Sequence, residues 1–549
     1  MHSFRSRVIA ILITLLIVGG CIAVAAAGYE IRYPEPEEEG EPASAYAIGK
    51  DTIYLWYTDE SLSDYLNTEA VNYSSVNDEI RVVPVLVSGR DYLESISDAS
   101  MTDEELPDLF IATGDTLEKA NLAGLAEPVT PPDNANITDV FSQTALNAVT
   151  YNGNLVAYPM FMECSAMCYN YTYLEQWARN TLEAEIRAQL AEEEKLAEES
   201  KSSDQASDPG TGTSNASASG KTGNAAKTEE EKKAEEEEKA RQEAELQEKI
   251  TSMVSDEDVD AYVEEHIPTT IDELLVLSDD FDAPEGVDTI FKWAVTDIFY
   301  NYFFIGDSID VGGPYGDDPT RIDIYNENAI KGLTTYQKLN QFFSISTDDV
   351  SYGGVIEDFE FGRIVMTIVT SDAVRSLAQA KADGDMEYEY RFTALPDISD
   401  TSAGRSMSVT DAIVVNGYSS HKAAANDFAY YLSTSAPDTL YEWTGKVSVL
   451  KDADYGEHND ELKVFAHEYE ESVPLPKMLE TSNYWVNLEM LFASVWDGAD
   501  ANEGLKKLSE QMKLQVTGEP VTEETIIIPE EVEEEDEIIE EGSEEDAEE

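Results

Sequence analysis

The sequence predicts an α/β fold divided into two lobes. Between residues 51 and 113, short apolar stretches alternate with amphipathic ones in the order strand, helix, strand, helix, strand. This order is typical of a mostly parallel sheet with helices on both faces. The alternation returns after residue 270, so we expect a second lobe of similar build. With 549 residues, 42% of them hydrophobic, the chain can fill two such cores.

The first lobe begins with three predicted strands, at residues 52–57, 80–87 and 107–113. The stretches between them, residues 60–73 and 91–99, have the apolar spacing of helices. Asn152 and Gly153 then predict a hairpin turn that leads into a return strand.

The later part of the chain repeats the pattern and ends in helices. Strand-like and helical stretches occupy residues 270–281, 290–295, 328–343, 363–372, 390–397 and 411–433. Residues 483–496 and 502–515 have apolar side chains three and four apart, which predicts two final helices.

The amino terminus predicts export and attachment to a membrane. Arg5 and Arg7 precede an apolar run that leads directly to Cys21, so residues 1–28 form a signal or anchor segment. Residues 18–21 are similar to a bacterial lipobox, which predicts lipidation of Cys21. An uncleaved helical anchor is the second interpretation, and cleavage after residue 27 with secretion is the third. The body would lie on the outer face of the cytoplasmic membrane, joined through an acidic tether at residues 29–49.

The formal net charge of -78 excludes two classes of partner. Such a chain repels nucleic acid and anionic lipid surfaces. Much of the charge lies in an insertion at residues 183–265 and in a tail at residues 518–549, which we expect to be disordered. Leu182 and Ile186, and pairs such as Glu237 and Arg241, have the spacing of helices, so the insertion is predicted to be a helical (coiled-coil) hairpin with a disordered tip.

Glu163 stands inside the apolar stretch 157–170. A buried carboxylate without a partner costs several kcal/mol, so this position is expected to open onto water, a partner or a ligand. Cys164 and Cys168 lie beside it, but no second cysteine pair or nearby histidine completes a metal site, and buried free thiols are the expectation. No cofactor or metal site is predicted.

Several motifs in order resemble the extracellular solute-binding proteins of ABC importers, and among them the maltose and maltodextrin binders. The motifs lie at residues 153–170, 268–275, 358–373, 392–397, 414–432 and 476–492. The resemblance implies a periplasmic-binding-protein-like fold, in which a hinge closes two lobes around a central cleft. Lobe 1 would comprise residues 50–161 and 410–452, and lobe 2 residues 162–409 and 453–517.

The resemblance also implies which residues face the cleft. The ligand-binding candidates are Trp56, Thr58, Asp59, Glu60, Asp115, Glu163, Asp297, Tyr300, Asp372, Tyr484 and Trp485. Glu163 would accept hydrogen bonds from sugar hydroxyls, and Trp485 would offer an aromatic face. Capping of the next helix is the simpler explanation for Asp59, Glu60 and Asp115 taken singly, and core packing is the alternative for Trp485.

Three positions depart from the maltose binders. Ala112 stands where those proteins carry tryptophan, Thr116 where they carry arginine, and Asp372 near the place of another tryptophan. Two aromatic platforms are therefore missing, and the cleft is predicted to be more polar and less suited to long glucans.

The sequence thus predicts a monomeric, non-enzymatic surface receptor. It would capture a mono- or oligosaccharide and deliver it to ABC permease subunits. A carbohydrate-active surface enzyme and a surface sensor or scaffold remain as alternatives, and a peptide or another polar solute remains possible as ligand. No G-x-S-x-G motif occurs, and residues 215–222 depart from a phosphate-binding loop because Asn215 replaces its first glycine.

Overall fold

The computed structural model describes residues 50–102, 106–132, 135–204, 229–347 and 350–528. Residues Thr52–Glu549 form one compact unit, and of the other unit, Met1–Asp51, only Lys50 and Asp51 are described. The apolar segment before Cys21, the tether, the tip of the insertion and the tail beyond residue 528 lie outside the described residues. The expected disorder of the tail from residue 518 on is wrong for its first part, because Ile526 and Ile528 pack against the core and Glu523 pairs with Lys513. Within the described ranges, no helix has the length and apolar character needed to cross a membrane.

The larger sheet has the strand order β14-β6-β13-β3-β1-β2, with β15 paired to β13. Its strands are β1 (Asp51–Tyr57), β2 (Ile80–Leu86), β3 (Leu109–Thr113), β6 (Tyr158–Glu163), β13 (Met407–Val415), β14 (Val447–Ser448) and β15 (Val473–Pro474). Strands β1 and β3 are parallel, whereas β13 runs antiparallel to both β3 and β6. The sheet is therefore mixed where the sequence predicted a mostly parallel one. Because β13 is antiparallel to both β3 and β6, the strands β1, β3 and β6 run in the same direction, and their carboxyl ends lie along the same edge.

The smaller sheet has the order β12-β7-β11-β8. Its strands are β7 (Ser165–Asn170), β8 (Thr289–Phe291), β11 (Ile364–Thr370) and β12 (Tyr390–Thr393). Strand β11 is parallel to β8 and antiparallel to β7. Because β6 ends at Glu163 and β7 begins at Ser165, the chain passes from one sheet to the other through the single residue Cys164.

Helices and short strands connect the two sheets. The helices are α2 (Ser63–Val76), α3 (Tyr92–Thr102), α4 (Leu117–Leu122), α5 (Ile137–Val140), α6 (Gln143–Ala148), α7 (Tyr171–Asp204), α8 (Glu229–Thr251), α9 (Asp256–His266), α10 (Ile271–Asp280), α11 (Ile298–Asn301), α12 (Glu327–Phe343), α13 (Tyr352–Glu360), α14 (Asp372–Asp383), α15 (Lys422–Ser433), α16 (Pro437–Thr444), α17 (Asn459–Glu471), α18 (Tyr484–Trp496) and α19 (Ala501–Thr517). Single 3-10 turns are η1 (Glu60–Leu62), η2 (Gly114–Thr116), η3 (Tyr302–Phe304), η4 (Gly313–Tyr315), η5 (Gly456–His458) and η6 (Leu479–Asn483). Two further strand pairs are β4 (Thr150–Tyr151) with β5 (Asn154–Leu155), and β9 (Asp310–Val311) with β10 (Ile322–Asp323).

The predicted hairpin at Asn152 and Gly153 is confirmed. Strands β4 and β5 pair on either side of it, and both turn residues have positive φ, 48° and 73°. A two-residue turn with both φ values positive matches the twist of the flanking strands, and glycine adopts this conformation without steric cost.

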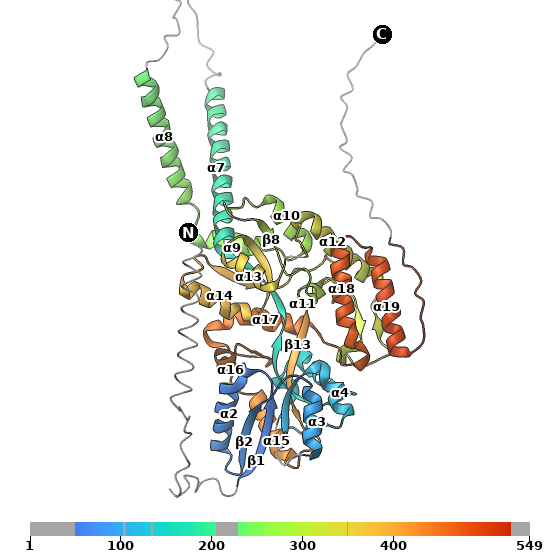
Figure 1. The fold of residues 1–549 in the computed structure, drawn as a ribbon. Helices are drawn as coiled ribbons and strands as arrows, with labels where there is room; N and C mark the ends of the chain where they lie inside the picture. Colours follow the sequence, from blue (N-terminus) through green and yellow to red (C-terminus); the bar gives the residue numbers. More distant parts are fainter. Residues whose placement is uncertain (1–49, 103–105, 133–134, 205–228, 348–349, 529–549) are drawn as a thin grey trace, which may run out of the picture. The chain divides into compact units, whose positions relative to one another are not determined.

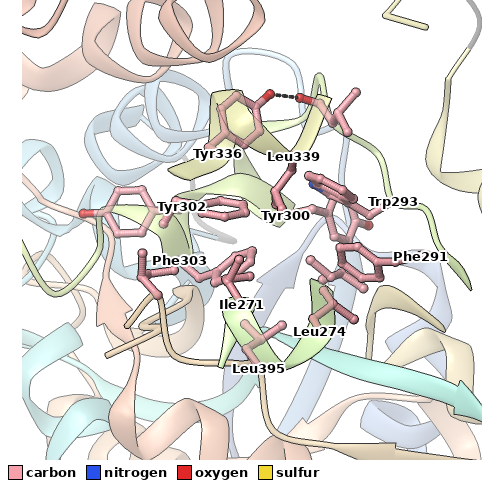
Figure 2. Close-up of a cluster of buried hydrophobic side chains, with 14 of the residues drawn as sticks. Ile271, Leu274, Phe291, Trp293, Tyr300, Tyr302, Phe303, Tyr336, Leu339 and Leu395 are labelled. Atoms are coloured by element: carbon pink, nitrogen blue, oxygen red, sulfur yellow. Dashed lines mark hydrogen bonds between the residues drawn. The ribbon is translucent and has the colours of Figure 1, made fainter. Parts of the chain in front are cut away.

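The largest core cluster is centred on aromatic side chains after β8. Trp293 is fully buried; its ring stacks on Phe291 at 4.8 Å between centroids and meets Trp496 edge-on at 5.3 Å. Its indole nitrogen donates to Asn301 Oδ1 at 2.8 Å. Figure 2 shows Trp293 and Phe291 beside the α10 residues Ile271 and Leu274, so this cluster fixes the segment that follows β8.

Both arms of the insertion are helical, as α7 and α8 (Figure 1). At their base, Leu182 and Ile186 pack against the core cluster, and Arg187 pairs with Glu243. Farther out, the described side chains at residues 191–196 and 236–240 are exposed. Only the base of the hairpin therefore contributes packing to the body.

Replacing residues 192–240 by a short glycine-serine linker is expected to leave the body intact. The free energy of unfolding should change by less than about 1 kcal/mol, because exposed side chains and longer surface loops contribute little to it. Urea unfolding of the two proteins measures the change, and ligand binding should also survive. A larger loss would mean that the outer hairpin supports the fold or a partner contact.

Candidate functional site

Glu163 lies where the edges of the two sheets meet. It is the last residue of β6 and pairs with Val409 of β13. Two residues later, Ser165 pairs with Thr370 at the end of β11, and its hydroxyl donates to the carbonyl oxygen of Phe299 in α11 at 3.2 Å. The crossover therefore brings the ends of β6 and β11 and the start of α11 close together.

On the side of the larger sheet, a carboxylate and a lysine form an ion pair. Asp59 follows β1, caps η1 through the amide nitrogen of Ser61, and lies 2.8 Å from Lys446 Nζ. Burial by itself would raise the pKa of Asp59, but the hydrogen bonds from Lys446 and Ser61 outweigh burial and lower the pKa. The ammonium also lies 5.4 Å from the centre of the Phe161 ring. Phe161 lies in β6 and pairs with Asp411 in β13, so Phe161 and Asp411 belong to adjacent strands.

On the side of the smaller sheet, two carboxylates flank a pair of tyrosines. Asp297 caps α11 through the amide nitrogen of Phe299 at 2.9 Å. Asp372, directly after β11, accepts hydrogen bonds from the hydroxyls of Thr370 and Tyr352, the latter at 2.9 Å. The rings of Tyr300 and Tyr352 stack with centroids 4.8 Å apart. This side thus offers oriented carboxylates next to the half-buried ring of Tyr352, whereas Tyr300 is only 6% exposed.

Electrostatic coupling joins the two sides through Glu163. Its side chain reaches solvent but is closely surrounded by protein. This desolvation raises the pKa of Glu163, and Asp372 and Asp297 raise it further, while Lys446 opposes them. Burial raises the pKa of Asp411 to about 7, with repulsion from Glu163, Asp59 and Asp115 adding to it. Among the described residues, no side chain or amide donates a hydrogen bond to the carboxylate of Glu163 or to that of Asp411.

A recess of about 420 Å³ opens beside this group of carboxylates. Its walls include Thr58, Asp59, Tyr92, Ala112, Thr116, Lys119, Phe161, Asp411 and Lys446. The volume is in the range of small-molecule sites. Ala112 and Thr116, two of the three departures from the maltose binders, both line it, so the small side chains at these positions leave space that larger ones would fill.

The structure brings seven of the eleven predicted residues into this region. These are Thr58, Asp59, Asp115, Glu163, Asp297, Tyr300 and Asp372. Asp115 accepts a hydrogen bond from Thr113 at 2.5 Å and contributes to the field at Asp411. Convergence of these side chains is what a polar ligand would require.

The other four predicted residues lie differently. Trp56 is half-buried against a core cluster of the larger sheet, and Glu60 is exposed in η1. Tyr484 is 1% exposed, because the start of α18 packs into the core, so it offers no surface to a ligand. The ring of Trp485 packs against that of Tyr302, with centroids 5.8 Å apart, which agrees with the core-packing alternative stated for Trp485. We leave these four out of the proposed site.

Sequence reasoning missed four members of the group: Phe161, Tyr352, Asp411 and Lys446. Asp411 interrupts the apolar strand β13 in the same way that Glu163 interrupts its own stretch, so the same signal would have found it. Lys446 follows a turn glycine and Tyr352 begins a helix, positions without any distinctive pattern. The expected buried free thiols are confirmed, since Cys164 and Cys168 are both fully buried.

Asp411 is expected to make stability depend on pH. Because its pKa rises from an ordinary 3.8 to about 7 on folding, the unfolded chain binds fewer protons than the folded one between these values. The free energy of unfolding should therefore fall as pH rises through that window and level off above it. Asp411→Asn should raise it by about 1–2 kcal/mol at neutral pH and not at acid pH, as urea unfolding would measure. Identical pH profiles of the two proteins would contradict this.

Comparison with known proteins supports the fold. Residues 249–438 match the family model of the bacterial extracellular solute-binding proteins. Comparison of the sequence with curated proteins gives no significant match.

Solved structures resemble most of the chain. An extracellular solute-binding protein from Staphylococcus aureus in complex with maltose has a TM-score of 0.60 and 15% identity, covering 85% of this chain and 98% of that one. A cyclo/maltodextrin-binding protein complexed with maltotetraose has a TM-score of 0.59 and 17% identity, covering 87% and 99%. The maltose-maltodextrin binding protein of Alicyclobacillus acidocaldarius has a TM-score of 0.54 and 15% identity, covering 84% and 100%. The chain therefore has the fold of the bacterial extracellular solute-binding proteins and matches their family model over residues 249–438, which confirms the resemblance seen in its sequence.

Proposed function

We propose that this chain is a surface receptor that captures a carbohydrate and delivers it to the permease of an ABC importer. The observation that carries the proposal is the convergence of polar groups from both sheets at the Glu163 crossover. Thr58, Asp59 and Asp115 come from the larger sheet, and Asp297 and Asp372 come from the smaller one. The solved relatives of the same fold hold maltose or maltotetraose.

The mechanism is binding coupled to closure. A ligand that hydrogen-bonds to both sides at once stabilises the arrangement in which they are close, so binding shifts the population toward it. The permease would then recognise the closed form. The receptor is monomeric, carries out no chemistry of its own, and is held at the membrane by a lipid on Cys21.

Sugar recognition suits the side chains present. Carboxylates accept hydrogen bonds from hydroxyl groups, and an aromatic face such as that of the half-buried Tyr352 can cover the C–H side of a pyranose ring. With alanine and threonine at positions 112 and 116, the site should favour a short sugar over a long glucan.

A thermal-shift screen of the intact protein against mono- and oligosaccharides tests the proposal. A ligand at about a hundred times its Kd adds roughly 2.7 kcal/mol to the free energy of unfolding, an effect large enough to detect. The expected result is a shift with at least one sugar. The absence of any shift across the screen would contradict carbohydrate capture and favour a peptide ligand or a scaffold role.

A carbohydrate-active enzyme is the second candidate function, and one observation favours it. With its pKa raised to about 7, Asp411 can be protonated near neutral pH, as a general acid must be. Incubation of the protein with oligosaccharides, followed by chromatography of the products, distinguishes the two functions. A receptor leaves the sugar unchanged.

A further inference from the structure

The group of carboxylates at the crossover has a large excess of negative charge. Six acidic side chains belong to it, namely Asp59, Asp115, Glu163, Asp297, Asp372 and Asp411. Lys446 is the one cation in contact with any of them among the described residues, and it pairs with Asp59. The other five carboxylates form no ion pair in the described structure, although Lys446 also attracts Glu163 and Asp411, and Lys477 attracts Asp115.

Three further cations lie near the site, and two of them donate hydrogen bonds to backbone carbonyl groups. Lys477 is buried and donates to the carbonyl oxygens of Asn147 and Tyr315. Arg375 donates to the carbonyl oxygen of Glu442 in α16. Lys119 lines the outer part of the recess and is exposed. None of these side chains forms an ion pair with the six carboxylates in the described structure, so the excess of negative charge remains.

Two carboxylates also lack hydrogen-bond donors: Asp411 is half-buried, and Glu163 reaches solvent. Glu163 and Asp411 receive no donor from the described residues, and the pKa of each is raised chiefly by desolvation. For the half-buried Asp411, an unsatisfied carboxylate is costly unless a ligand or water supplies the donors. Both lie at the crossover, which the solute would occupy.

A bound metal ion does not suit this arrangement. Nowhere in the described ranges do three acidic, histidine or cysteine side chains come close enough to hold one ion. Asp59 and Asp411 line the recess of about 420 Å³ and the other four carboxylates of the group do not, so an organic molecule with its own donors suits this arrangement better than a single ion. Tyr352, which is half-buried and stacks on the buried Tyr300, adds an aromatic face, and such faces attract ammonium groups as well as sugar rings.

We infer that the solute carries a positive charge, and that this site selects a sugar with a free amino group over its neutral counterpart. The inference rests on the proposed function, since it names the class of carbohydrate. The ammonium group would lie among Glu163, Asp411 and the carboxylates of the smaller sheet, while hydroxyl groups would bond to the remaining acceptors.

Matched sugars test this inference on the intact protein. Glucosamine, galactosamine and mannosamine are titrated calorimetrically beside glucose, galactose and mannose and beside the three N-acetylated amines. The glucosamine trimer, its N-acetylated form and cellotriose extend the comparison to oligosaccharides, because they differ only in the substituent at C2. The expected result is that at least one free amine binds about tenfold or more tightly than both its neutral and its acetylated counterpart, the difference between charged and neutral hydrogen bonds.

Salt and two variants identify the cause of any preference. Affinity for the amine should fall as salt rises from about 50 to 500 mM, whereas affinity for a neutral sugar should not. In Glu163→Gln and in Asp411→Asn, the ratio between amine and neutral sugar should shrink several-fold. Glu79→Gln, an exposed position just before β2, should keep the ratio of the original protein.

Each outcome bears on a different claim. If a neutral sugar binds as well as its amine, the charge inference is wrong while carbohydrate capture stands. An amine preference that does not decrease as salt rises would also contradict the charge inference. If neither kind of sugar binds at millimolar concentration, both the inference and the proposed function fail.

Discussion

Glu163→Ala is expected to weaken sugar binding by about 10- to 100-fold, because a charge-assisted hydrogen bond contributes roughly 1.5–3 kcal/mol. The carboxylate has no hydrogen-bond donor in the described protein, so truncation should remove a contact made with the ligand and no contact within the fold. The melting temperature of the free protein should therefore stay the same or rise, since repulsion from Asp372 and Asp297 is relieved.

Calorimetric titration with the best sugar from the screen measures the loss of affinity. Glu163→Gln keeps the shape and should bind more tightly than the alanine variant but less tightly than the original protein. Glu79→Ala serves as the control, because it removes an exposed carboxylate that does not belong to the group at the crossover. Unchanged affinity in Glu163→Ala would place the sugar elsewhere.

Trp293→Ala is expected to lower the free energy of unfolding by about 3–5 kcal/mol, the usual cost of emptying a fully buried aromatic position. The ring contacts Phe291 and Trp496, and its loss also leaves Asn301 Oδ1 without its donor. The cavity would lie directly behind the segment that carries Asp297 and Tyr300. Loss of stability should thus be accompanied by weaker sugar binding.

Urea unfolding measures this loss, and an exposed tryptophan provides the control. Trp443 is 48% exposed at the end of α16, so Trp443→Ala should change the free energy of unfolding by less than about 1 kcal/mol. A similar small change in Trp293→Ala would contradict the central role given to this cluster.

The sequence predicted the elements of the fold better than their directions. Apolar stretches identified β1, β2, β3 and β11, and Asn152 with Gly153 identified a hairpin. Strand direction depends on pairing between distant segments, such as β13 with β6, and no local pattern contains that information. For this reason the sequence did not predict that the larger sheet is mixed.

The residues of the candidate site divide in the same way, into those that a local pattern can predict and those that only the fold brings together. Glu163 could be singled out because a carboxylate in an apolar strand requires a reason, and the structure places it at the crossover. Lys446 and Tyr352 carry no such signal; only the fold brings them to Asp59 and Asp372. Tyr484 was misplaced because an aromatic residue at a helix start has the same pattern whether it faces a ligand or the core.

The central claim is that one solute contacts both sheets at the Glu163 crossover, and hydrogen-deuterium exchange tests it most directly. With a saturating sugar, exchange should slow together in three places: the end of β1 with η1, the β6–β7 crossover, and the end of β11 with the start of α14. Protection at one sheet alone, at other surfaces, or nowhere with any sugar would contradict the claim.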